Sequence, residues 1–305
     1  MKSVKLFVIL LIILSGQCKQ DNRETILVSG SETMHVMMDA VAKEFMKRNA
    51  GYNVVVKGGG SFRGIHALME NKTDLAISSR ELSEDELNRL QYVKKDLEVV
   101  VVAYDGIAIV VNPQNVAGEI HLRDLADVFS GKITNWKQLG GRDVPVKVVI
   151  RNDNSGTSMF FKTYVLREKY LGDKEFTKNS KKEYTLAAKI VSDNYEMSDY
   201  IKENPGAIGY MGMGSAAIEN KTKVKVLKFS RGKNGDYILP SPASVFKREY
   251  KLNRALYMIY KPDQGFKIDA FASFVLSKEG QTAILNSGYL KSTMKQIEVK
   301  TYVED

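Results

Sequence analysis

The chain has 305 residues, 44% of them hydrophobic and 27% charged, which is an ordinary globular composition with room for one large or two medium domains. The formal net charge of +9 suits an anionic ligand, but lysines are interspersed with acidic residues, and no RNA-recognition or zinc-finger spacing occurs. These features argue against a nucleic-acid partner.

The N-terminal segment has the layout of a secretory leader. Two lysines precede an apolar run over 6–14, and Cys18, the only cysteine of the chain, follows. We therefore predict a signal peptide over 1–17, a tether over 18–24 and an extracytoplasmic location. The apolar run is too short for a permanent membrane span. Cys18 resembles the lipid-attachment site of bacterial lipoproteins, which implies a lipid anchor in the membrane. The alternative is an exported protein with an incidental cysteine.

The first part of the chain is predicted to alternate strands and helices. A strand over 25–29 leads into a turn over 30–33 and a helix whose methionine-rich apolar side faces a core. The same order of strand, glycine-rich turn and helix recurs over 53–70, and a third strand follows at 74–78. We expect an open α/β sheet, in which the turns at the carboxyl ends of the strands line one crevice.

The middle of the chain is predicted to form a second lobe. An apolar segment over 99–111 marks the crossing into it, and we expect there a packed Trp136 and a basic loop over 174–182. A stretch rich in Gly, Asn, Asp and Pro at 232–242 marks the return. Lobe 1 is then discontinuous, and the boundaries that we predict are 24–104 plus 240–305 for lobe 1 and 105–239 for lobe 2.

The most informative turn is Arg151-Asn152-Asp153-Asn154-Ser155-Gly156-Thr157. It lies between an apolar β-branched run and a helical pattern, so it contains the first, unpaired N–H groups of a helix. Gly156 allows close backbone approach, hydroxyls can donate, and Arg151 offers a planar fork of charged donors. A plain helix cap explains this turn equally well on its own. Three turns that all combine glycine, hydroxyl side chains and the start of a helix, however, indicate a single oxyanion site.

Enzymatic interpretations of the same turns fit poorly. The glycines match neither a P-loop nor a dinucleotide fingerprint, and no Gly-x-Ser-x-Gly nucleophile elbow occurs. The three histidines lack metal-ligand spacing. We therefore predict no enzyme activity, no cofactor and no metal.

Seven segments resemble, in order, the extracytoplasmic phosphate-binding component of the phosphate ABC transporter. The most specific is the Arg-x-Asp-x-Ser-Gly-Thr run. The resemblance implies a two-lobed periplasmic binding fold of type II, in which each lobe is a mixed sheet flanked by helices, that acts as a monomer and delivers phosphate to an inner-membrane permease. The segments are 30–33, 59–64, 74–77, 131–136, 151–157, 205–210 and 274–281.

The resemblance also implies roles for individual residues. Arg151 would pair with phosphate and be held by Asp153. Hydroxyl and amide donors would come from all three turns: Ser31, Thr33, Ser61, Ser155, Gly156 and Thr157.

One position departs from the family. Arg80 stands where the best-studied members have an aspartate that accepts the proton of hydrogen phosphate and thereby rejects sulfate. An arginine cannot accept a hydrogen bond. We hypothesise that Glu32 has become the acceptor and that Arg80 adds a second phosphate-binding cation; a solvent-facing Arg80–Glu32 pair is the alternative. A binder of another tetrahedral oxyanion, or a surface lipoprotein with an adhesion or signalling role, remains open.

Overall fold

The computed structural model describes residues 23–93, 97–232, 235–262, 265–292 and 300–301. The predicted signal peptide over 1–17 and Cys18 lie outside the described residues. Within the described ranges, no helix is both long and apolar enough to cross a membrane.

Twelve strands of the described chain form one mixed sheet. They are β1 (Glu24–Gly30), β2 (Tyr52–Gly59), β3 (Leu75–Ser78), β4 (Glu98–Val111), β5 (Glu119–His121), β6 (Lys147–Arg151), β7 (Lys189–Val191), β8 (Ala207–Gly212), β9 (Lys225–Ser230), β10 (Asn253–Tyr260), β11 (Leu290–Lys291) and β12 (Lys300–Thr301). The main path runs β2-β1-β3-β10-β4-β8-β6-β7. β1 is parallel to β2 and β3, whereas β10 is antiparallel to β3 and β4. The predicted α/β class is confirmed.

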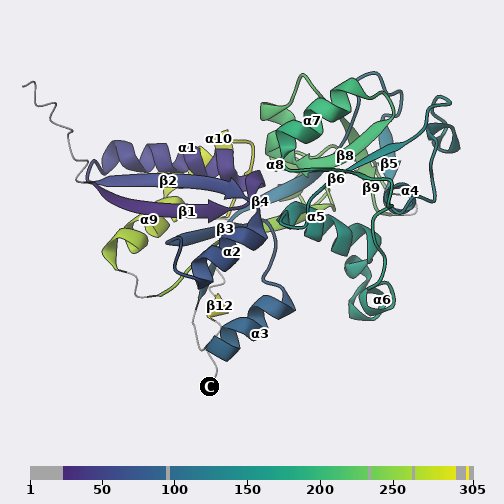
Figure 1. Ribbon diagram of the computed structural model, residues 1–305. Coiled ribbons are helices and arrows are strands. Elements are labelled where there is room, and N and C mark those ends of the chain that lie inside the picture. Colours follow the sequence, from purple (N-terminus) through teal and green to yellow (C-terminus); the bar gives the residue numbers. More distant parts are fainter. Residues whose placement is uncertain (1–22, 94–96, 233–234, 263–264, 293–299, 302–305) are drawn as a thin grey trace, which may run out of the picture.

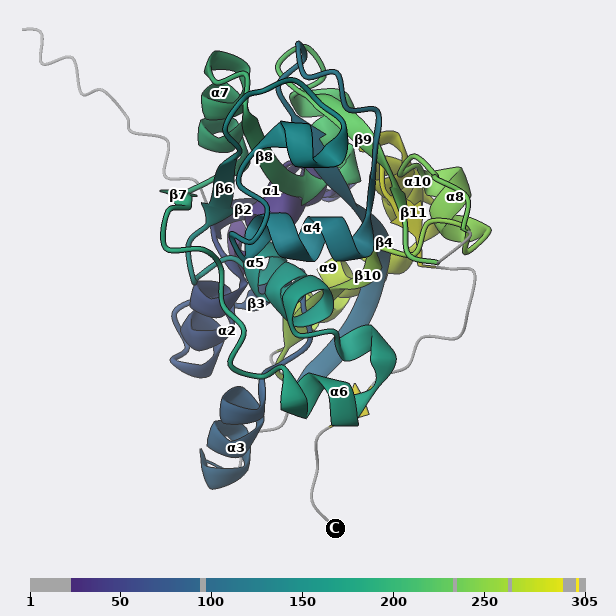
Figure 2. The same cartoon turned by 90° about the vertical axis from the view of Figure 1, so that its right-hand side faces the viewer.

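Helices cover both halves of this sheet, and Figure 1 shows two lobes side by side with β4 between them. The helices are α1 (Glu32–Arg48), α2 (Ser61–Met69), α3 (Glu84–Val93), α4 (Leu122–Phe129), α5 (Gly156–Phe161), α6 (Asp173–Lys178), α7 (Asn194–Glu203), α8 (Pro242–Phe246), α9 (Phe266–Leu276) and α10 (Lys278–Asn286). A π-helical turn at Lys162–Leu166 continues α5. Figure 2 looks onto the second lobe, with α4 in front of its strands and α7 and α6 at opposite ends.

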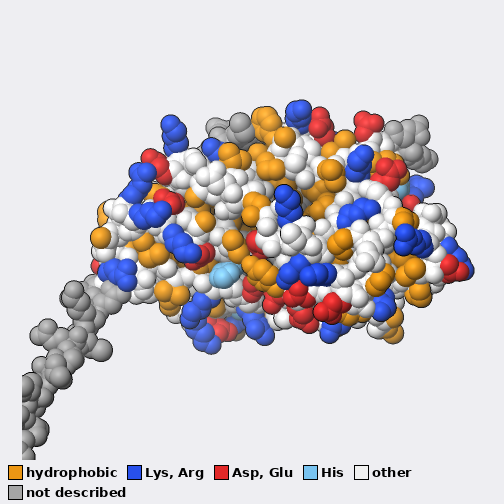
Figure 3. Space-filling view, turned by 90° about the horizontal axis from the view of Figure 1, so that it is seen from above, with side chains coloured by type: hydrophobic (Ala, Val, Ile, Leu, Met, Phe, Trp, Pro, Cys, Tyr) orange, Lys and Arg blue, Asp and Glu red, His pale blue; other side chains and the backbone are white. Residues whose placement is uncertain are grey.

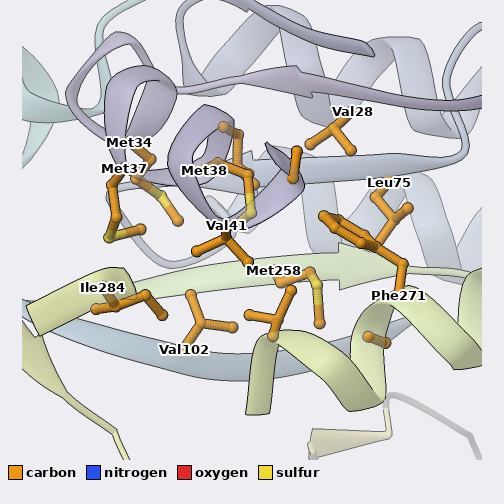
Figure 4. Packing of buried hydrophobic residues seen from close by; sticks show 14 of the residues in the cluster. Val28, Met34, Met37, Met38, Val41, Leu75, Val102, Met258, Phe271 and Ile284 are labelled. Carbon is orange, nitrogen blue, oxygen red and sulfur yellow. The ribbon is translucent and has the colours of Figure 1, made fainter. Parts of the chain in front are cut away.

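The core of the first lobe lies between α1, the sheet and the C-terminal helices α9 and α10. Met34, Met37 and Met38 repeat at helical spacing, so all three face the sheet, where they pack near Met258 of β10 (Figure 4). The predicted methionine core is therefore confirmed. Neighbouring β3 residues point to opposite faces, which places Ala76 in a separate cluster under α2.

The second lobe has its own core. Alternate residues of β4 point to its two faces, with Ile109 among α4, α5 and Trp136, and Val110 beneath α7. Trp136 is buried, and its indole N–H donates to Gly206 O at 3.0 Å. A tryptophan whose N–H is satisfied in this way is a packed anchor, as predicted.

The packing of the described residues bears on the return crossing, which we predicted near 240. Val245, Tyr250 and Leu252 pack in the core of the second lobe, whereas Leu256 packs in that of the first. Gly and Pro in the 232–242 stretch mark a loop, and a loop need not coincide with a packing boundary. We propose that lobe 2 extends to Leu252 and that lobe 1 resumes in β10.

Two basic segments belong to regular elements. The predicted loop over 174–182 begins with helix α6, and its side chains are largely exposed. The segment over 221–228 leads into β9, where Leu227 is buried and Lys228 exposed. The alternation of lysines with apolar residues there is a strand pattern.

Candidate functional site

The three predicted turns converge between the lobes. Each ends at the first turn of a helix: α1 and α2 in lobe 1, and α5 in lobe 2. The hydroxyl oxygens of Thr33 and Thr157 are 2.8 Å apart, and Phe62 N–H donates to Asn154 O at 3.3 Å. The amino-terminal ends of three helices, with their unpaired N–H groups, therefore meet at one place.

The predicted hydroxyl donors are all buried: Ser31, Thr33, Ser61, Ser155 and Thr157. Ser155 caps α5, because its Oγ accepts from Ser158 N–H at 3.2 Å. Ser61 Oγ accepts from Ser79 N–H at 3.1 Å. Ser31 Oγ has no hydrogen-bond partner among the described residues, although a buried hydroxyl normally has one. Ser155 thus satisfies the plain-cap interpretation, whereas Ser31 offers an unused hydroxyl.

Arg151 lies at the end of β6 with its side chain buried. Its Nε and one terminal nitrogen donate to Ser192 O, at 3.1 and 2.7 Å, and the other donates to Asn194 Oδ1 at 2.8 Å. We predicted that Asp153 holds Arg151, but in the structure the side chain of Asp153 is exposed. Asn194, at the start of α7, takes that place.

The positive charge of Arg151 is not cancelled by these contacts, because both partners are neutral oxygens. Burial lowers the pKa of the Arg151 guanidinium from its ordinary value, since a low-dielectric surrounding disfavours the charged form. Three hydrogen bonds use three of its five N–H donors, so within the described part of the chain two remain for a ligand. A bound anion would supply the missing negative charge.

A hydroxyl network fixes the backbone at Arg151, and sequence reasoning missed it. Ser158 Oγ donates to Arg151 O at 3.0 Å and accepts from Tyr210 Oη at 3.0 Å. Tyr210 is fully buried and Tyr184 partly buried, and desolvation raises the pKa of both phenols, so they stay neutral donors at neutral pH. Their spacing in the sequence gave no sign that they meet.

Glu32, the first residue of α1, lies against the second turn. Its Oε1 accepts from Gly59 N–H at 2.5 Å. Both Glu32 oxygens can accept more than one hydrogen bond, so acceptor capacity remains. This placement keeps the hypothesis of a relocated acceptor open, and it remains a prediction.

Arg80 has a different partner from either of those that we predicted. It is buried and forms a two-pronged ion pair with Glu86 of α3, at 2.7 and 2.8 Å, and it also donates to Glu81 O at 2.7 Å. It is therefore not a solvent-facing partner of Glu32, and its charge is neutralised rather than offered to a phosphate. The predicted phosphate contact of Arg80 has no support in this arrangement.

We expect Glu86→Gln to lower the free energy of unfolding by about 3 kcal/mol at pH 7, because it leaves the buried Arg80 charge unpaired. Burial alone would raise the pKa of Glu86, but the hydrogen bond and charge of Arg80 outweigh it and hold the pKa below its ordinary value. This stability is present above the ordinary pKa and is lost as pH falls through the lowered one. Urea titrations from pH 7 to 3 measure the free energy of unfolding of both proteins, and the two values should therefore converge at low pH. A difference that stays constant with pH would contradict the pairing.

Arg254, on β10, is a site residue that the sequence did not reveal. Its guanidinium is buried, pairs with Asp105 at 3.0 Å and donates to Thr157 Oγ1 at 3.0 Å. Burial lowers the pKa of Arg254 and raises that of Asp105, and the attraction between the two groups partly offsets both shifts. A lone arginine at the start of an apolar strand carries no sequence signal for this role.

Two further observations concern charge and possible metal ligands in the described part of the chain. Lysines and arginines are interspersed with acidic side chains on the face seen in Figure 3. No group of three or more His, Cys, Asp or Glu that could hold a metal occurs among the described residues. His121 caps α4, and His66 stacks against Phe62.

Comparisons with known proteins agree with this geometry. A family model described as a PBP superfamily domain matches residues 16–279. The phosphate-binding protein PstS of Borreliella burgdorferi is 27% identical over 94% of this chain and 99% of its own. A Clostridium perfringens substrate-binding protein assigned to phosphate ABC transport, solved with bound phosphate, is 28% identical with a TM-score of 0.74 over 88% of this chain and 99% of its own. An ABC-type phosphate transport receptor from Vibrio cholerae is 28% identical with a TM-score of 0.66 over 88% and 100%.

Proposed function

This chain belongs to the PBP superfamily, and from that membership we propose that it binds inorganic phosphate outside the cytoplasm and delivers it to an ABC permease for import. Its relatives named for phosphate binding span nearly the whole chain, and one similar structure contains phosphate. The chain itself performs no covalent chemistry in this role.

The observation that carries the proposal is the buried cation of Arg151. Its direct partners are neutral, and it lies in lobe 2 beside the convergent amino-terminal ends of three helices. Such a place is unfavourable for a cation without an anion, and helix N–H groups and hydroxyls are ready donors to oxyanion oxygens. Phosphate satisfies both needs at once. The predicted donors Ser31, Thr33, Ser61, Ser155, Gly156 and Thr157 remain proposed ligands.

Binding drives closure in this proposal. The donors come from both lobes, so a phosphate gains its full set of hydrogen bonds only when the lobes meet. A ligand that binds the closed form better shifts the population toward it. The closed lobes then present one joint surface to a membrane permease, which releases the phosphate. A monomer is sufficient for this cycle.

The location follows from the N-terminal segment. An extracytoplasmic chain held by a lipid on Cys18 would stay beside its permease, and the described fold begins only a few residues later, at β1. Mass spectrometry of the protein from its native membrane tests this: a lipid-modified Cys18 as the first residue is expected, and a chain that begins elsewhere contradicts the anchor.

Calorimetric titration with phosphate, sulfate and arsenate tests the proposed function. We expect micromolar or tighter phosphate binding, since about ten charge-assisted or neutral hydrogen bonds can replace hydration in such a site. Tighter binding of a different oxyanion would support the second candidate function, for which the neutralised Arg80 is the specific observation. Binding of none of the three would favour the surface-interaction role.

We expect Glu32→Gln to reduce the preference for phosphate over sulfate by at least about tenfold, because an amide accepts the phosphate proton less well and no longer repels fully ionised sulfate. Competition calorimetry with both anions measures the ratio. Asp39→Asn, an exposed acid on the same helix that pairs with Lys43, is the matched control. An unchanged ratio in Glu32→Gln would end the hypothesis of a relocated acceptor.

A further inference from the structure

Arg254 lies where the chain passes between the lobes. It faces Asp105 in the antiparallel pairing of β10 with β4. Leu252, two residues before it, packs in the core of lobe 2, and Leu256, two residues after it, packs in the core of lobe 1. The ion pair between Arg254 and Asp105 therefore connects the two strands at the hinge.

From this place the guanidinium contacts both lobes. In lobe 1, one terminal nitrogen donates to Ser79 O at 3.0 Å. In lobe 2, the other nitrogen donates to Thr157 Oγ1 at 3.0 Å, and the guanidinium lies over the ring of Phe160, 5.7 Å from its centre. Both lobe 2 contacts come from α5, so they exist only while α5 is held against lobe 1.

Thr157 is also within reach of Thr33, whose hydroxyl lies 3.4 Å from the same nitrogen of Arg254. These two hydroxyls are proposed phosphate ligands from opposite lobes. A charged donor beside both of them fixes where their oxygens lie. Since one of the two hydroxyls donates to the other, one hydroxyl proton of the pair is free to point at an anion.

One donor of Arg254 opposes this arrangement. Its Nε is buried and has no hydrogen-bond partner among the described residues. A buried N–H without an acceptor is unfavourable, and water would satisfy it in an open cleft. The closed form thus gains the contacts to α5 and loses the hydration of Nε, a balance that allows the cleft to reopen.

We propose that Arg254 is the positioning residue of lobe closure: anchored at the hinge by Asp105, it holds α5 of lobe 2 against lobe 1 and thereby sets how much of the protein is closed at a given phosphate concentration. The inference rests on the proposed function and adds to it a residue outside the three turns. Since apparent affinity falls with the closed fraction, weaker contacts to α5 raise the Kd for phosphate without removing a phosphate ligand.

Arg254→Lys tests this inference in the chain from Lys19 onward, which holds every described residue. Lysine keeps the charge beside Asp105 but lacks the fork that reaches Thr157. We expect a Kd for phosphate raised roughly 10- to 100-fold by calorimetry. We also expect the radius of gyration at saturating phosphate, measured by small-angle X-ray scattering, to exceed that of the wild-type protein.

Two further variants isolate the cause. Phe160→Leu removes the ring over Arg254 on the partly exposed side of α5, together with its stacking on Tyr164 within lobe 2, and it should raise the Kd several-fold. Glu86→Gln disrupts the buried pair with Arg80 in lobe 1, away from the hinge, and it should lower stability but leave both the Kd and the compaction unchanged. A wild-type chain that does not bind phosphate would refute the proposed function itself. The role of Arg254 would be overturned if the wild-type chain bound phosphate and both Arg254→Lys and Phe160→Leu had a Kd within twofold of the wild-type value and the same radius of gyration.

Discussion

Arg151→Ala is expected to weaken phosphate binding about a thousandfold, because it removes two charge-assisted hydrogen bonds that contribute roughly 2 kcal/mol each. The side chain is buried, and its partners Ser192 and Asn194 are neutral, so the variant leaves no unpaired negative charge in lobe 2. Folding should therefore be little affected. Calorimetry measures the affinity, and a thermal melt without phosphate checks the fold. A loss below tenfold would remove Arg151 from the site.

The same assay separates the two residues that could orient Arg151. Asn194→Ala removes an acceptor 2.8 Å from the guanidinium and should weaken phosphate binding roughly tenfold. Asp153→Asn changes an exposed side chain and should leave the affinity within about twofold. If Asp153→Asn weakened binding more than Asn194→Ala, the interpretation that the sequence suggested, in which Asp153 holds Arg151, would be restored.

The contrast between Asp153 and Asn194 shows what the sequence could predict. The turn chemistry was readable because glycine, serine, threonine and arginine stood within a few residues of a strand end. The partner of Arg151 was not readable, because Asn194 comes from a helix 43 residues further along the chain. Only the packing of α7 against β6 brings the two together. Proximity in sequence was a poor guide to contact.

The two buried arginine ion pairs lead to the same conclusion. Arg80 was visible as a departure from a family pattern, but its partner Glu86 is one of three acids in the first turn of α3, so its residue type alone does not single it out. Arg254 and Asp105 are 149 positions apart, and the register of β10 against β4 decides their contact. Strand register is set by packing in three dimensions, so residue types along the chain did not reveal it.

The α/β class and the first strands and helices of the chain could be predicted for a physical reason. Apolar residues at periods of two and of three to four report which face of a strand or helix is buried. Met34, Met37 and Met38 are an example, since their spacing alone placed them in a core. The lobe boundary is harder to predict, because a glycine- and proline-rich segment indicates a change of direction, whereas the packing of residues such as Tyr250 and Leu252 is the basis on which we propose a later boundary.

Gly156→Ala is expected to abolish high-affinity phosphate binding, with a loss of at least about a hundredfold, while leaving the unliganded protein as stable as before. Gly156 is the first residue of α5, where alanine is the better helix former. A Cβ at this position would lie 2.3 Å from Ser61 Oγ and 2.9 Å from Ser61 Cβ, both in lobe 1. The clash therefore exists only when the lobes are closed. A ligand that needs the closed form loses affinity in proportion to the closed population.

Matched controls make this result specific to closure. Gly51→Ala in lobe 1 and Gly118→Ala in lobe 2 add the same methyl group where nothing lies within 4 Å, so both should bind phosphate like the wild-type protein. Scattering at saturating phosphate should show Gly156→Ala remaining open and both controls closing. If Gly156→Ala bound phosphate normally, the contact between α5 and Ser61 would not belong to the ligand-bound state. The convergence of the three turns would then be a feature of packing rather than of recognition.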